Sequence, residues 1–149
     1  MRAREPDADG FVDRGGVKLH WEVFGDGEPA LLLLPTWTVI HTRFWKAQIP
    51  YLARHFRVVT YDGPGNGRSD RPENPGPCGY EEQGRAAAAV REATGTDRAV
   101  VVSLSMASQW TLWLMANRPD RVHGGVFIGP SLELGEGYED LEHPFDEPY

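Results

Sequence analysis

Short apolar runs alternate along the chain with segments that have the composition of helices. The runs at 31–34 and 99–102 are rich in leucine and valine, which is typical of strands buried on both faces of a sheet. Residues 17–25 instead alternate between apolar and polar positions, as a strand with one exposed face does. The pattern predicts strands at residues 11–13, 17–25, 30–35, 57–62, 99–104 and 124–129.

Helices are predicted at residues 42–54, 79–94 and 106–117. Pro50 interrupts the first of them, and it can either begin a second short turn or kink the helix. The alanines at 86–89 favour the second helix, and Gly95 is placed to end it. Because strands and helices alternate, we predict an α/β protein with a mostly parallel sheet and helices on both of its faces.

The two ends of the chain lack this periodicity. Residues 1–9 are polar, and from 131 to 149 the chain is acidic with little apolar surface to bury. We therefore expect a disordered N-terminus over 1–9, one domain over 10–130 and a poorly ordered acidic tail over 131–149. The loop at 71–79 is rich in proline and glycine and should lie on the surface.

Composition narrows the classes of function. The net charge of -7 argues against a nucleic-acid partner, which would require a basic face. No apolar run reaches the roughly 18 residues of a membrane span, and the polar start does not have the form of a signal peptide. We therefore expect a cytoplasmic protein. The single cysteine allows no internal disulfide, the histidines form no metal pattern, and the glycine-rich turn at 63–67 lacks a dinucleotide-binding spacing. No cofactor is predicted.

Ser105 is the strongest chemical candidate. It stands where the apolar strand at 99–104 runs into the helix predicted at 106–117, with the small residues Ser103 and Ala107 two positions before and after it. Small neighbours are required where a sharp strand-to-helix turn lifts a nucleophile above a sheet, as in the G-x-S-x-G elbow. The arrangement predicts that Ser105 is a nucleophile.

Several further blocks resemble the α/β-hydrolase family and run in that family's order. They are an early strand at 16–25, a third strand and oxyanion loop at 31–37, a strand and turn at 57–70 ending in Gly-Arg-Ser-Asp, and a helix end and sixth strand at 117–128. The resemblance implies an incomplete α/β-hydrolase core with about six of the family's eight strands. In this family the triad's acid and histidine follow the serine, so the chain is expected to be truncated before them and inactive alone.

The resemblance also implies roles for residues around the elbow. The N–H groups of Met106 and Trp37 would hold the oxyanion, and the Thr36 hydroxyl can add a hydrogen bond. Thr36, His41 and Trp45 are expected to line the substrate pocket, while core packing is an equal alternative for Trp37. The implied reaction is hydrolysis of an ester or related acyl bond of a small molecule. Lyase and cofactor-free peroxidase chemistry stay open, because a fold does not fix a reaction.

The histidines offer no evident base for the serine. His20 should point outward from its strand, whereas His55 and His123 precede strands and so lie at the amino edge of the sheet, away from the nucleophile. His41 and His143 remain as candidates for the base, although a solvated or packed histidine is the more common case.

Two carboxylates near the active edge receive different interpretations. Asp62 ends a strand, and we expect it to accept backbone hydrogen bonds from the turn at 63–69 and so pin that turn. Glu133 follows the sixth strand and is the candidate acid, with solvated surface charge as the alternative.

A different class of function fits the same residues. The chain can be a catalytically inactive fragment, or a protein-binding module that uses the same half-fold. An unpaired sixth strand would expose apolar side chains and free backbone groups at 126–128. Self-association through this edge is therefore expected as an alternative to catalysis.

Overall fold

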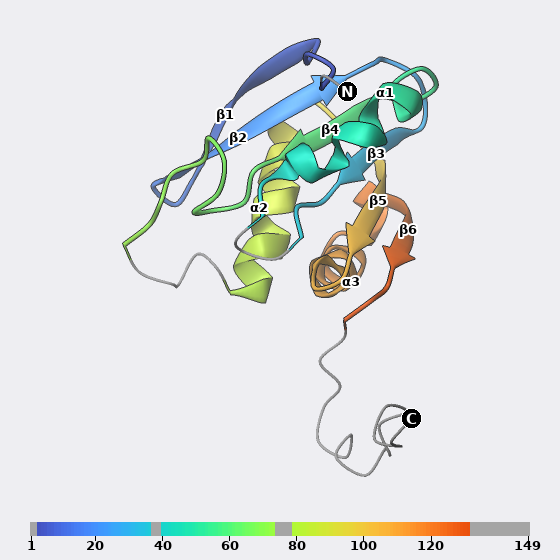
Figure 1. Cartoon of the computed structure of the whole chain (residues 1–149). Coiled ribbons are helices and arrows are strands. Elements are labelled where there is room, and N and C mark those ends of the chain that lie inside the picture. Colours follow the sequence, from blue (N-terminus) through green and yellow to red (C-terminus); the bar gives the residue numbers. More distant parts are fainter. Residues whose placement is uncertain (1–2, 37–39, 74–78, 132–149) are drawn as a thin grey trace, which may run out of the picture.

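The computed structural model describes residues 3–36, 40–73 and 79–131 of the chain. Within them, a six-stranded sheet with the order β1-β2-β4-β3-β5-β6 forms the centre of the molecule (Figure 1). Its strands are β1 (Ala8–Arg14), β2 (Val17–Phe24), β3 (Ala30–Leu33), β4 (Val58–Tyr61), β5 (Ala99–Leu104) and β6 (Val122–Ile128). β2 pairs antiparallel with β1 and β4, and the remaining pairs are parallel. The predicted α/β architecture with a mostly parallel sheet is confirmed.

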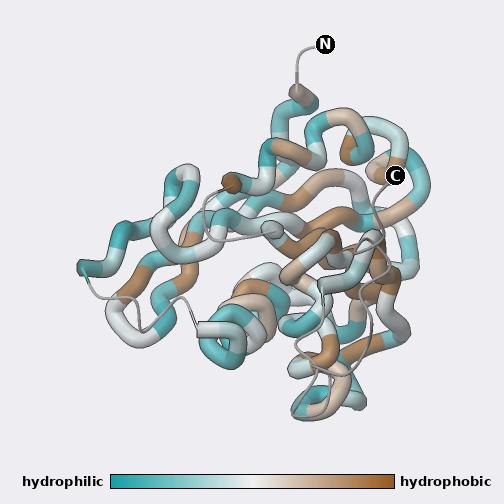
Figure 2. The backbone as a smooth tube through the Cα atoms, turned by 60° about the horizontal axis from the view of Figure 1, so that its bottom comes forward, coloured by the Kyte–Doolittle hydropathy of each residue, from teal (hydrophilic) through white to brown (hydrophobic). Residues whose placement is uncertain are grey.

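Helices pack on both faces of the sheet. One layer contains α2 (Tyr80–Ala93) and α3 (Ala107–Asn117), and the other contains η1 (Thr42–Ala47) and α1 (Ile49–Leu52); the short η3 (Pro119–Arg121) precedes β6. β5 serves both layers because its side chains alternate. Val101 lies in the core beneath α2 and α3, whereas Val100 and Val102 pack against the core beneath η1 and α1. Hydrophobic positions accordingly gather in the middle of the molecule (Figure 2).

Two local predictions differ from the structure. The helix predicted at 42–54 forms as two pieces, η1 and α1. Pro50 causes the break, because it lacks a backbone N–H and stands in the first turn of α1, where none is needed. At the amino end, Ala8 and Asp9 were expected to be disordered but pair with β2 as part of β1. A polar strand is tolerated there because β1 lies at an edge of the sheet.

The opposite edge of the sheet is apolar. In β6, Val126, Phe127 and Ile128 are 46%, 37% and 43% exposed. Val126 and Ile128 pair with the β5 residues that face the η1 and α1 layer. Within the part of the chain that the structure describes, β6 pairs only with β5, so its outer backbone groups have no strand partner. No helix among those residues is long and apolar enough to cross a membrane.

Candidate active site

Ser105 occupies the turn between β5 and α3 in a strained backbone conformation. Its φ is +54°, and it is the one non-glycine residue in the described ranges with a positive φ. Such a conformation persists only where the surroundings hold it. The Ser105 N–H donates to the carbonyl of Ile128 (3.0 Å), and the Ser105 carbonyl accepts from the N–H groups of Ser108 (3.0 Å) and Ser131 (3.2 Å). The serine thus lies at the carboxyl edge of the parallel strands, where open α/β sheets bind ligands.

The residues two positions from Ser105 are limited in size rather than in backbone freedom. Ser103 and Ala107 are both 0% exposed, and neither has a positive φ. A glycine is therefore not needed at either position, whereas a large side chain would not fit. The buried hydroxyl of Ser103 donates to the carbonyl of Val126 at 3.2 Å, which satisfies its hydrogen-bonding requirement. This explains how a degenerate form of the elbow pattern builds the same turn.

A pocket of about 460 Å³ opens beside the serine. Its lining consists of Thr36, Ile40, Leu104, Ser105 and Met106. Met106 stands at the start of α3, where backbone N–H groups have no carbonyl one turn earlier to bond and favour a negative charge. Apart from two hydroxyls, the lining side chains are apolar. The pocket therefore suits an apolar group next to the Ser105 hydroxyl and an anion-favouring helix start.

Thr36 lies in the pocket wall, but its hydroxyl is engaged. It donates to the carbonyl of Leu104 at 2.7 Å, and a hydroxyl has one proton to donate. While this bond is in place, the expected donation from Thr36 to an oxyanion is not available. Trp37, the other expected oxyanion donor, lies outside the described residues.

Two of the expected pocket residues lie elsewhere. Trp45 is 5% exposed and packs in the core beneath η1, where its Nε1–H donates to the carbonyl of Leu34 at 3.0 Å. The expectation that Trp45 lines the pocket is therefore wrong. His41 is exposed, and its Nδ1 accepts the Arg43 N–H at 3.2 Å, which caps the start of η1. Ile40, which sequence reasoning missed because a single apolar residue in a loop gives no periodic signal, lines the pocket instead.

His55 and His123 lie at the amino edge of the sheet, as predicted. The surroundings of His20 differ from the prediction. His55 contacts Gly27 just before β3, and His123 lines a cleft with Glu28 and Arg57 at the amino ends of the strands. His20 lies on the face of β2 opposite Leu19 and Trp21, as alternation predicts, but it is only 2% exposed, so its side chain does not face solvent. The turn after β4 folds over this face of β2, and Ser69 Oγ accepts the His20 N–H at 2.8 Å. His143 lies outside the described residues, as does Glu133.

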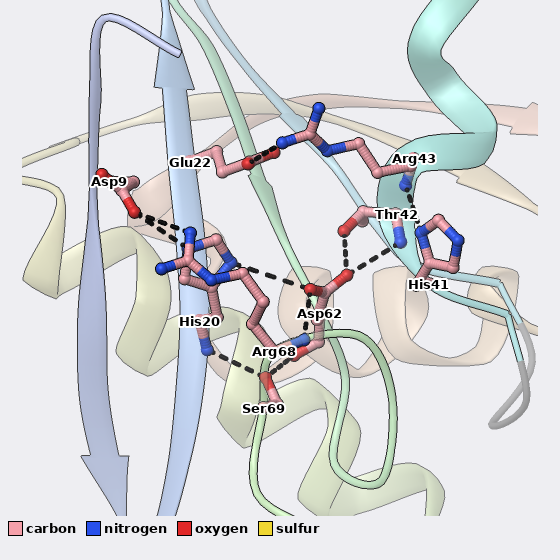
Figure 3. Close-up of polar contacts among 9 residues, drawn as sticks. All are labelled: Asp9, His20, Glu22, His41, Thr42, Arg43, Asp62, Arg68 and Ser69. Atoms are coloured by element: carbon pink, nitrogen blue, oxygen red, sulfur yellow. Dashed lines mark hydrogen bonds and ion pairs between the residues drawn. The ribbon is translucent and has the colours of Figure 1, made fainter. Parts of the chain in front are cut away.

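Asp62, directly after β4, joins three segments of the chain (Figure 3). One carboxylate oxygen, Oδ1, accepts the Thr42 N–H (3.0 Å) and the Thr42 hydroxyl (2.6 Å). The other, Oδ2, accepts the Arg68 N–H at 3.0 Å and lies 3.7 Å from His20 Nδ1. The prediction that Asp62 pins the glycine-rich turn is confirmed, and the contact with Thr42 is a finding that the sequence did not indicate.

The electrostatics of Asp62 follow from these contacts. Burial by itself raises the pKa of the Asp62 carboxyl, but the hydrogen bonds from Thr42 and Arg68 and the nearby His20 ring outweigh it, so this pKa lies below its usual value. Gly67 makes the close approach possible. Its φ is +51°, and a side chain there would overlap the Asp62 carboxylate. Asp62 is therefore held as an ionised group with its oxygens occupied.

The polar network extends to β1 (Figure 3). Asp9 Oδ2 lies 3.2 Å from His20 Nε2 and 2.9 Å from the Arg68 guanidinium. Hydrogen bonds from His20 and Arg68 lower the pKa of the Asp9 carboxyl. Because an ionised carboxylate only accepts, the Nε2 of His20 carries the proton in this contact. In the same region Arg43 contacts the buried Glu22 at 2.7 Å, which ties η1 to β2.

Ser105 lacks a comparable set of partners. Among the described residues, no histidine or carboxylate forms a hydrogen bond with its hydroxyl, and no group of histidine, cysteine, aspartate or glutamate is arranged to hold a metal ion. A serine hydroxyl needs an adjacent base to become an effective nucleophile. The described residues therefore place Ser105 in a strand-to-helix turn beside a pocket, with no base in contact with its hydroxyl.

Comparison with known proteins identifies the class to which this fold and site belong. The family model of the alpha/beta hydrolase fold matches residues 29–146, and the chain belongs to this family. Among curated proteins, it is 33% identical over 114 residues to RutD of Caulobacter segnis, a candidate carbamate hydrolase, in a match that covers 76% of this chain and 42% of that protein. A pimeloyl-[acyl-carrier protein] methyl ester esterase of Sodalis glossinidius is 42% identical over 53 residues, covering 36% of this chain and 20% of the esterase.

A solved structure agrees with this assignment. A hydrolase from Pseudomonas aeruginosa PA01 superimposes with a TM-score of 0.76 and 29% sequence identity, over 91% of this chain and 51% of the other. The chain thus spans about half the length of the proteins it resembles, since the matched shares of RutD and of the P. aeruginosa hydrolase are 42% and 51%.

Proposed function

We propose that residues 10–130 form the N-terminal part of an enzyme domain that hydrolyses ester or related acyl bonds through Ser105. The observation that carries the proposal is the backbone of Ser105. A serine at φ +54°, between a parallel strand and a helix and beside a pocket, accepts a conformational cost that packing alone does not require. The names of the relatives, a candidate carbamate hydrolase and a methyl ester esterase, agree with acyl chemistry.

In this proposal each group has a definite role. The Ser105 hydroxyl attacks the carbonyl carbon of the substrate, and the Met106 N–H, with that of Trp37, stabilises the oxyanion. The pocket formed by Ile40 and Leu104 receives the apolar acyl part. The base that takes the serine proton and the acid that orients it come from sequence that corresponds to the second half of the longer relatives. This chain alone is then a nucleophile without its base.

Chemical rescue tests this assignment on the chain as it is. With p-nitrophenyl butyrate as substrate, the protein and its Ser105→Ala variant should release nitrophenol at the same low rate. Added imidazole should substitute for the absent base, and intact-mass spectrometry should then show a butyryl group on the unmodified protein but not on Ser105→Ala. Ser103→Ala is the matched control, because Ser103 is buried and should not affect acylation.

Two other outcomes would contradict parts of this proposal. Rapid turnover without imidazole that depends on Ser105 would mean that this chain contains its own base. Absence of acylation with imidazole, in a protein whose circular dichroism shows the native fold, would overturn the proposed nucleophile.

A second candidate function rests on the β6 edge. Val126 and Ile128 are exposed along a strand with no outer partner among the described residues, which is a template for pairing with another strand. We therefore propose self-association through β6 as the alternative. Size-exclusion chromatography with light scattering should show dimers or larger species that Val126→Lys reduces. Leu112→Lys, on the exposed side of α3, is the matched control and should have no effect. A monomer at all concentrations would exclude this alternative.

A further inference from the structure

Two residues that line the Ser105 pocket, Thr36 and Ile40, come before η1 in the chain. A threonine hydroxyl bonds at or near each of them. Thr36 lines the pocket and donates to the carbonyl of Leu104, the residue just before the serine, at 2.7 Å. Ile40, which also lines the pocket, lies two residues before Thr42. Thr42 is 4% exposed and donates through both its N–H and its hydroxyl to Asp62. Thr36 is therefore tied to β5, and the segment of Ile40 and Thr42 is tied to the Asp62 carboxylate after β4.

The bonds between Thr42 and Asp62 are not needed to hold the turn after β4. Asp62 is already tied to its own turn by two other bonds: its carboxylate accepts the Arg68 N–H at 3.0 Å, and its backbone carbonyl accepts the Ser69 hydroxyl at 2.6 Å. The two bonds from Thr42 cross to another element, and both end on the same ionised oxygen. Hydrogen bonds to a charged acceptor are roughly twice as strong as neutral ones, and the 2.6 Å hydroxyl contact is short. Asp62 is thus the main polar anchor of the start of η1.

We propose that Asp62 is a positioning residue for the pocket: by holding Thr42 it fixes Ile40 against the space beside Ser105 and so sets which acyl groups fit. This inference rests on the proposed function in one respect, that Ser105 receives an acyl group. Asp62 itself contacts neither the serine nor the pocket among the described residues. Its effect is transmitted through Thr42 and the short connection to Ile40.

The charged surroundings determine how this anchor responds to pH. His20 faces Oδ2 of Asp62, and behind it stand Asp9 and the Arg68 guanidinium. On the side of η1, His41 caps the same segment and Arg43 pairs with Glu22. The anchor should persist to a pH below the ordinary aspartate value of 3.8, because the Asp62 pKa is lowered, and it should weaken when that carboxyl gains a proton.

Nuclear magnetic resonance of the full chain tests the anchor without any reaction. The amide protons of Thr42 and Arg68 should shift together on acid titration with a common midpoint. In Asp62→Asn this shared titration should be absent, and the protection of the Thr42 amide against hydrogen exchange should fall about tenfold or more. Protection of Val101 in β5 should be unchanged. Thr42→Val gives a second variant should Asp62→Asn fail to fold, Thr42→Ser should restore the anchor, and Lys46→Gln, exposed on η1, is the control.

The second readout is selectivity in the imidazole-assisted acylation of Ser105. Thr42→Val should lower the ratio of butyrate to acetate transfer severalfold, as should Ile40→Ala, whereas Thr42→Ser and Lys46→Gln should keep the wild-type ratio. A purely structural role would lower both rates equally and leave the ratio unchanged, which would overturn the positioning role. Unchanged protection of Thr42 in folded Asp62→Asn would overturn the anchor itself. If the wild-type protein is never acylated, the proposed function fails and the resonance data still decide the anchor.

Discussion

Asp62 and Ser105 occupy equivalent places in the sheet and have opposite surroundings. Each directly follows a parallel strand, β4 or β5, at the carboxyl edge. Asp62 is 6% exposed and accepts hydrogen bonds on both oxygens. Ser105 is strained and faces a pocket of about 460 Å³, with a hydroxyl that no described side chain engages. A place at the active edge therefore does not make a residue reactive. A polar group without a hydrogen-bond partner, on a strained backbone, is a better indicator of a reactive residue.

The largest change in the free energy of unfolding is expected from a substitution that disrupts the contacts of Asp62. Gly67→Ala places a methyl group on the Asp62 carboxylate and also adopts a left-handed φ of +51°. It should lower the free energy of unfolding by about 3 kcal/mol, measured by urea denaturation. Gly65→Ala is the matched control, because Gly65 has a φ of +84° but no atom within 4 Å of the added methyl; it should cost only about 1 kcal/mol of strain. Equal losses would mean that contact with Asp62 is not limiting.

Acid should remove the contribution of Asp62 to stability. Because the pKa of this carboxyl is lowered in the folded protein, its contribution is present above the unfolded value of 3.8 and is lost as pH falls through the folded value. Asp62→Asn should therefore be about 2 kcal/mol less stable at neutral pH, and this gap should narrow as the pH falls below the unfolded value of 3.8. Asp9 titrates in both proteins and cancels in the difference. A gap that does not change with pH would contradict an ionised anchor.

The smallest change in stability should be an increase, and it tests whether the backbone of Ser105 is strained. Ser105→Gly relieves the left-handed strain and should raise the free energy of unfolding by up to about 1 kcal/mol. Ser105→Ala keeps the Cβ and the strain, so its stability should remain near that of the unmodified protein. Urea denaturation of the three proteins measures the difference. A glycine variant that is less stable than the alanine variant would show that the backbone at this position is not strained.

Much of the fold could be predicted because its signals are local. The valine-rich run of β5 and the small residues around Ser105 lie within a few positions of one another, and both led to the correct strand-to-helix turn. The break at Pro50 is likewise a local effect, but the burial of Trp45 is not. In η1, with about three residues per turn, Thr42 and Trp45 fall on one buried face, which draws the tryptophan into the core.

The errors concern what covers a residue rather than which element contains it. Alternation in β2 correctly separates two faces, but it does not reveal that the turn carrying Ser69, about fifty positions later, folds over His20. The sequence does not indicate that the hydroxyl of Thr36 is engaged, because its acceptor, the Leu104 carbonyl, lies 68 positions away. The contact between Asp62 and Thr42 was missed for the same reason. Such contacts are decided by tertiary packing, which no window of sequence contains.

The backbone bonds between Ser105 and the end of β6 have a kinetic consequence. Its N–H is held by Ile128 and its carbonyl by Ser131, so the elbow depends on the strand that has the least cover and lies at an edge. Edge strands open locally at a lower free energy than the core does. Each such opening would let Ser105 relax to an ordinary φ, and the serine would be poised only during the intervals between openings. Any strand that docks on β6 would lengthen those intervals and so act on Ser105 from a distance.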